Sequence, residues 1–188
     1  MKHLRRDLIS LLLPTLLTLH PITAPAKDKD APVSAAKLER VREKNVRKAR
    51  EKMAADSKEY RREEFAELEQ IYQKGNTNPR TPENQVFLKQ VLEKFPKSNR
   101  AGCAALYLGR YTKGKEQEEY LEMAIEKFSD CYYGDGTHVG GYARYVMGMM
   151  EHAAGKRSAA KKRFDEIRKD YAQTTDHGGQ LVIENLPK

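Results

Sequence analysis

Tryptophan is absent from this 188-residue chain, and cysteine occurs only twice. Long apolar runs are equally scarce: the one present, the 12 residues from Leu8 to Leu19, is shorter than the ~20 residues that span a bilayer. The sequence also lacks a phosphate-binding glycine loop, a nucleophile elbow and a zinc-ligand spacing. We therefore expect no enzyme, no cofactor, no metal site and no transmembrane segment in the mature chain.

The first 26 residues have the composition of a secretory signal peptide. Lys2, Arg5 and Arg6 form a charged head, the leucine-rich run follows, and Ala24-Pro25-Ala26 supplies small residues for cleavage. The competing interpretation is a membrane anchor, for which the run is too short. We expect cleavage after Ala26 and an exported protein, periplasmic or secreted, with the general and twin-arginine export routes both open.

The segment 27–57 is a charged arm that follows the signal peptide. Propensity predicts a helix over 34–57, because this stretch contains neither glycine nor proline. Asn45, Lys48 and Lys52 interrupt its apolar positions, so we expect no stripe able to dock and place the folded domain in 58–188. The arm concentrates eight cations, Lys37, Arg40, Arg42, Lys44, Arg47, Lys48, Arg50 and Lys52, against three glutamates.

The rest of the chain is patterned as helices of three- and four-residue period. Apolar faces recur over about 60–72, 82–95, 101–111, 120–131, 140–150 and 160–171, separated by glycine and proline. A 38-residue step relates Gly102, Gly140 and Gly178, and the same step relates Phe95, Tyr133 and Tyr171. A period in the thirties is typical of a helical solenoid. The fold class predicted is therefore all-α, with a fourth, incomplete unit at 178–186.

Two sets of residues resemble the tetratricopeptide repeat. Phe95-Pro96-Lys97-Ser98 is followed by Leu108-Gly109 and by Ala124 and Phe128, and Gly148, Ala160 and Phe164 are spaced by 12 and then 4 residues. The resemblance covers about 60–186 and is to the subtype found in exported bacterial proteins. It implies a short array of helical hairpins that binds a protein or peptide in an open groove.

The resemblance also indicates which side chains would line this concave groove. Candidates there are Arg110, Lys113, Tyr142, Arg144, Met149 and His152, of which the cations would form a positive rim. The even cysteine count would permit a disulfide between Cys103 and Cys131, with two buried thiols as the alternative.

Two functions remain open from the sequence. The first is a non-catalytic scaffold or adaptor for protein–protein interaction in the cell envelope. The second is attachment to an anionic membrane surface or another polyanion through the basic arm, consistent with the net charge of +8. An exported protein would not meet nucleic acid, so we do not expect it as a partner. Salt dependence separates the two functions, because polyanion binding weakens steeply with salt.

Overall fold

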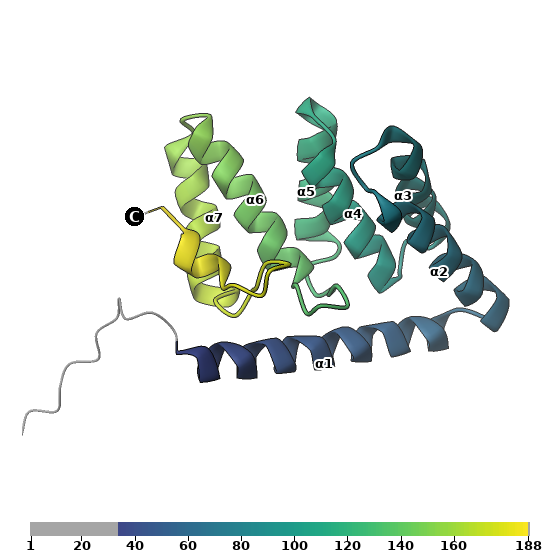
Figure 1. The fold of residues 1–188 in the computed structure, drawn as a ribbon. Coiled ribbons are helices and arrows are strands. Elements are labelled where there is room, and N and C mark those ends of the chain that lie inside the picture. Colours follow the sequence, from purple (N-terminus) through teal and green to yellow (C-terminus); the bar gives the residue numbers. More distant parts are fainter. Residues whose placement is uncertain (1–33, 188) are drawn as a thin grey trace, which may run out of the picture. The chain divides into compact units, whose positions relative to one another are not determined.

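The structure is a computed structural model that describes residues 34–187. Within this range the chain is all-α, as predicted, with seven α-helices, one short 3-10 helix and no strand (Figure 1). The helices are α1 (Ala35–Glu59), α2 (Arg62–Thr77), α3 (Pro82–Lys94), α4 (Asn99–Tyr111), α5 (Gly114–Glu126), α6 (Val139–Ala153), α7 (Arg157–Asp170) and η1 (Val182–Asn185). The predicted signal peptide, 1–26, lies outside the described residues.

Helices α2 to α7 form three successive hairpins, α2/α3, α4/α5 and α6/α7, and each hairpin packs on the next. Local chemistry explains where the helices begin. Pro82 occupies the first turn of α3, and the Ser98 hydroxyl accepts a hydrogen bond from the Ala101 amide, 3.0 Å away, at the start of α4. The apolar faces of the six helices then meet in one continuous core, in which Leu68, Leu106 and Ile167 are fully buried.

Glycine allows the two helices of a hairpin to cross closely. A β-carbon at Gly75 would lie 2.6 Å from a Leu88 side-chain carbon, and one at Gly109 would lie 2.8 Å from a Leu121 carbon. The two crossings are equivalent and 34 residues apart. Any larger residue would force the helices of these hairpins apart.

The 38-residue step that relates Phe95, Tyr133 and Tyr171 is wrong. Each hairpin ends in the same turn, closed by hydrogen bonds from Ser98 N to Phe95 O, Cys131 N to Phe128 O, and Thr174 N to Tyr171 O. The aromatic between Phe95 and Tyr171 is therefore Phe128, not Tyr133. The true steps are 33 and 43 residues, which average to 38.

Two structured loops account for the uneven step. Loop 131–138 is held by an isolated antiparallel bridge between Tyr132 and His138, and loop 174–181 by the same kind of bridge between Thr175 and Leu181. Gly178 lies in the second loop rather than in a helix. The fourth unit expected at 178–186 is therefore this loop followed by the single 3-10 turn of η1.

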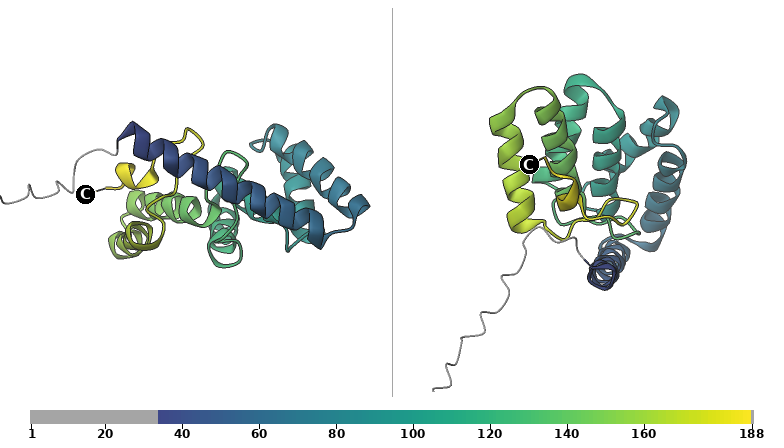
Figure 2. Two further views of the ribbon diagram at one scale, coloured as in Figure 1. Left: turned by 90° about the horizontal axis from the view of Figure 1, so that it is seen from below. Right: turned by 60° about the vertical axis from the view of Figure 1, so that its left-hand side comes forward.

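Helix α1 packs against the ends of the hairpins (Figure 2, view from below). The expectation that this segment has no stripe able to dock is wrong, because Val41, Asn45, Ala49 and Asp56 lie on one face and are buried. Two of these four residues are polar. A search for apolar periodicity therefore does not detect this buried face of α1.

Polar contacts connect α1 to the second and third hairpins. Asp56 accepts the Asn99 amide at the start of α4 through both carboxylate oxygens, at 2.9 and 3.0 Å. Asn45 donates to the Gln173 carbonyl, 2.9 Å away, after α7. The 11 residues from Asn45 to Asp56 rise by about 16 Å, enough for one straight helix to meet both hairpin ends.

Among the helices between residues 34 and 187, none is both long and apolar enough to cross a bilayer.

Candidate functional site

A row of tyrosine and arginine side chains crosses the three hairpins. It runs from Arg80, in the turn between α2 and α3, through Tyr111 and Arg110 at the end of α4, to Tyr142 and Tyr145 on α6. We call these five residues the Tyr–Arg row. Residues from three separate hairpins thus form one continuous stacked surface.

The stacking is close throughout the row. The Arg80 guanidinium carbon lies 5.3 Å from the Tyr111 ring centroid, and the Arg110 carbon lies 5.1 Å from both the Tyr111 and the Tyr142 centroids. Tyr142 and Tyr145 are stacked at 5.9 Å with an interplanar angle of 11°. Cation–π contacts of this kind contribute roughly 0.5–2 kcal/mol each, depending on desolvation. They fix flexible arginine side chains in place.

Loops 174–181 and 131–138 contact the row through the ring of His177. The His177 ring lies 5.7 Å from the Tyr142 ring and 4.7 Å from the Tyr133 ring. Its Nδ1 atom is 2.7 Å from a carboxylate oxygen of Asp135, which ties loop 174–181 to loop 131–138. Burial alone would raise the pKa of Asp135, but the hydrogen bonds from His177 and from the Thr137 amide lower it below its usual value. This hydrogen bond thereby fixes the His177 ring against which Tyr142 packs.

The row has unused binding capacity. Within 34–187 neither arginine of the row has a carboxylate partner, and the phenol oxygens of Tyr111, Tyr142 and Tyr145 make no hydrogen bond. Tyr142 is 9% exposed, whereas Tyr111 and Tyr145 are half-buried. The row can therefore offer cations, phenol groups and ring edges to a ligand without breaking an existing bond.

The structure brings together part of the groove predicted from the sequence. Arg110 and Tyr142 belong to the row, Lys113 is exposed just beyond α4, and Met149 is half-buried on α6. His152 lies elsewhere, exposed near the end of α6, where its ring is 6.3 Å from that of Phe164 in α7.

Arg144 also points away from the row. Its Nε donates to Glu166 on α7 over 2.9 Å, its Nη1 donates to the Gly140 carbonyl over 2.9 Å, and its guanidinium lies 4.4 Å from the Tyr171 ring centroid. This arginine joins α6 to α7. Sequence reasoning missed Arg80 and His177, because both come from irregular loops that no helical period reaches.

The eight cations of the basic arm divide into two groups. Lys44 donates to the Gln173 side chain over 2.9 Å, Lys48 donates to the Tyr132 hydroxyl over 3.3 Å, and Lys52 pairs with Asp130. These three contact the hairpin ends. Arg42 pairs with Glu39 of the same helix, and its guanidinium lies against Gly179 of loop 174–181. The other four, Lys37, Arg40, Arg47 and Arg50, are exposed on α1.

The two cysteines are free and buried. Cys103 Sγ faces the Tyr132 carbonyl at 3.4 Å, and Cys131 packs against Gly102. Burial raises the pKa of Cys103 well above that of an ordinary thiol and raises the pKa of Cys131 to about 12. Both therefore behave as small apolar core residues, which is the alternative to a disulfide that the sequence left open.

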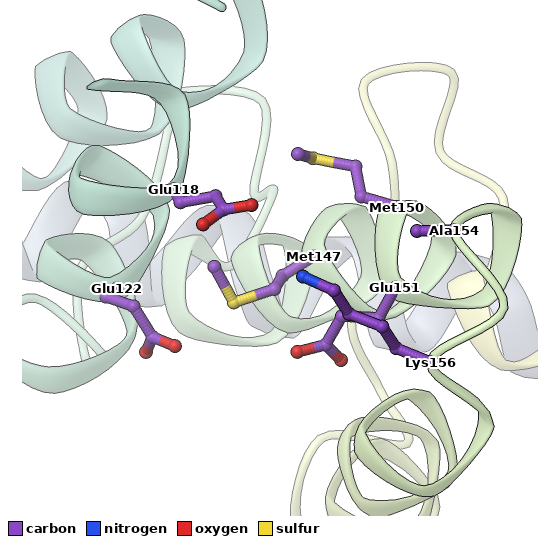
Figure 3. Close-up of a pocket in the computed structure, with 7 residues that line it drawn as sticks. All are labelled: Glu118, Glu122, Met147, Met150, Glu151, Ala154 and Lys156. Atoms are coloured by element: carbon purple, nitrogen blue, oxygen red, sulfur yellow. The ribbon is translucent and has the colours of Figure 1, made fainter. Parts of the chain in front are cut away.

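A pocket of about 230 Å³ lies between α5 and α6 (Figure 3). Glu118 and Glu122 approach it from α5, and Met147 and Glu151 from α6. Burial raises the pKa of Glu151, although Arg163 stands 3.9 Å from its carboxylate and partly offsets the effect. The Arg163 guanidinium also pairs with Glu122, so the charge in this pocket is already partly compensated from within the fold.

Among residues 34–187, no group of three or more histidine, cysteine, aspartate or glutamate side chains is placed to hold a metal ion. Comparisons with family models, curated proteins and solved structures gave no match.

Proposed function

We propose that this chain is a non-catalytic, exported scaffold of the tetratricopeptide type, which binds a segment of a partner protein along the Tyr–Arg row. Two features support the repeat type. The first two hairpin crossings, at Gly75 and Gly109, are 34 residues apart, which is the length of that repeat. The helices also follow one another as hairpins packed side by side. The leader composition of the first 26 residues supports export to the cell envelope.

The observation that carries the proposal is the open chemistry of the row. Tyrosine and arginine dominate the energetically important centres of protein interfaces, since both offer large contact area and polar groups. Here they are held by stacking before any partner arrives, which reduces the entropy cost of binding. Because Arg80, Arg110 and the neighbouring Lys113 have no carboxylate partner within 34–187, the segment that fits them best is acidic.

A second function, attraction to anionic surfaces, has narrower support. Lys37, Arg40, Arg47 and Arg50 are exposed on α1 and make no ion pair within the described residues. Three other cations of the arm contact the hairpin ends, which reduces the charge available to such a surface. Binding through these four exposed cations would weaken strongly as the salt concentration rises, because salt screens solvent-exposed charges.

Selection from a displayed peptide library tests the main proposal. We expect the full chain to enrich peptides rich in aspartate and glutamate. Arg110→Glu should weaken the binding of the selected peptides by at least about tenfold, because it replaces an attractive contact with a repulsive one. Lys127→Glu provides the matched control, since Lys127 is exposed and lies outside the row.

Equal weakening by Arg110→Glu and Lys127→Glu would contradict the proposal, because it would make the attraction one of net charge alone. Unfolding temperatures of both variants should match that of the parent chain, which excludes loss of fold as the cause.

A further inference from the structure

A cleft of about 320 Å³ lies beneath α1, between that helix and the end of the third hairpin. Lys44, Asn45 and Lys48 line it from α1, and Tyr132 and His138 line it from loop 131–138. The third side is formed by the last two residues of α7, Lys169 and Asp170, and by residues 171–174 after that helix. We call it the α1 cleft. It does not overlap the Tyr–Arg row and takes no part in the function proposed above.

The floor of the cleft is aromatic and well ordered by its own contacts. The Tyr132 and His138 rings are 4.5 Å apart, and the His138 and Tyr171 rings are stacked at 5.3 Å. On the α1 side the Lys48 ammonium lies 5.6 Å from the Tyr132 centroid. A ligand would therefore meet a base of aromatic rings, with the Lys48 ammonium beside the Tyr132 ring.

Positive charge predominates in this cleft. Lys44, Lys48 and Lys169 line it, whereas Asp170 is the one carboxylate among its lining residues. The neighbouring Asp130 is paired with Lys52. Lys48 and Lys169 have no ion-pair partner within the described residues, so both could turn toward an anion.

The imidazole of His138 lies in the same field. Burial is the largest cause that lowers the pKa of His138 to about 4; Lys48, Arg144 and Lys52 add to the decrease, and Asp130 offsets only part of it. The ring is therefore neutral at physiological pH. The same positive potential that disfavours a proton on this ring favours a negatively charged ligand beside it.

We propose that the α1 cleft binds a phosphoryl group, held by Lys44, Lys48 and Lys169 over the rings of Tyr132 and His138. Three ammonium groups suit a compact multivalent anion, because each supplies a point charge with several donors. A free phosphate compound and a phospholipid headgroup carry the same chemistry.

The probe is pyrophosphate, titrated into the full chain at fixed ionic strength and followed through the His138 ring signals in NMR. We expect saturable binding and an increase in the pKa of His138. Lys48→Gln should weaken binding about tenfold, since it removes a charged contact. Lys58→Gln, which removes an exposed lysine from the last turn of the same helix, should change it less than about twofold. Thermal unfolding of each variant controls for fold.

Vesicles with and without phosphatidic acid distinguish the two sources of the group. Displacement of bound vesicles by pyrophosphate would place the lipid headgroup in the cleft, and pyrophosphate binding without vesicle binding would assign a soluble phosphate compound. Failure of pyrophosphate to bind, or equal effects of Lys48→Gln and Lys58→Gln, would overturn the proposal. Vesicle binding without pyrophosphate binding would overturn it too, and would assign the attraction to the exposed arginines of α1.

Discussion

His138 shows how strongly a single position can depend on its surroundings. It precedes α6 and its ring lies between two tyrosine rings, close to cations from α1 and α6. In the sequence it follows Gly134-Asp135-Gly136-Thr137. Its environment includes residues as distant in the sequence as Lys48, which the sequence around His138 could not indicate.

This environment predicts a pH dependence of stability. The pKa of His138 is about 4 in the folded chain and about 6.5 when exposed, so the unfolded chain binds more protons between these values. The free energy of unfolding should therefore fall by up to about 3 kcal/mol as the pH drops from 6.5 to 4. Urea unfolding at several pH values measures this decrease.

The matched comparison uses two histidine variants. His138→Gln should flatten the pH dependence, whereas His152→Gln, at an exposed histidine, should keep it. The assignment fails if the His138→Gln chain loses stability with falling pH as steeply as the parent.

At the scale of the element, α1 is the helix whose role differs most from expectation. Its inward face is half polar, and one of its anchors is the Asp56 carboxylate at the N-terminus of α4. Burial raises the pKa of Asp56, and the amide hydrogen bonds at the start of α4 offset part of that rise, because the carboxylate satisfies an amide that the helix leaves unbonded and complements the helix dipole. Asn99 extends the connection, since its side chain donates to the Tyr132 carbonyl, 2.8 Å away, and accepts the Tyr132 amide at the same distance.

Removal of this anchor should therefore destabilise the whole fold. Asp56→Ala leaves the buried Asn99 amide without its partner, which should lower the free energy of unfolding by roughly 1–3 kcal/mol. Glu43→Ala, at an exposed position of the same helix, should change it by less than about 0.5 kcal/mol. Chemical denaturation of both variants measures the difference. Indistinguishable midpoints would mean that α1 is not part of the cooperative unit.

Helix type and order could be predicted from the sequence, because apolar residues recur at helical spacing and Gly or Pro marks the ends. The repeat step could not, because loops of different length concealed offsets of 33 and 43 behind a mean of 38. Two residues of the row, Arg110 and Tyr142, were among the groove candidates named from the sequence. Arg80 and the direction of Arg144 depend on tertiary contacts, which spacing does not reveal.

At the scale of the whole molecule, the described residues combine three hairpins, one helix along their ends and two surfaces of different character. The Tyr–Arg row spans all three hairpins, whereas the α1 cleft lies at the end of the third. A protein segment and a phosphoryl group could thus be held at once.

Site-specific photocrosslinking in growing bacteria tests the central claim most directly. A photoreactive phenylalanine analogue replaces Tyr145 of the row in one variant and the exposed Lys127 in another. Because a protein partner would lie against the row, we predict a discrete crosslinked adduct at position 145 that Arg110→Glu abolishes, and none at position 127. No adduct at 145, or the same adduct at both positions, would contradict the account.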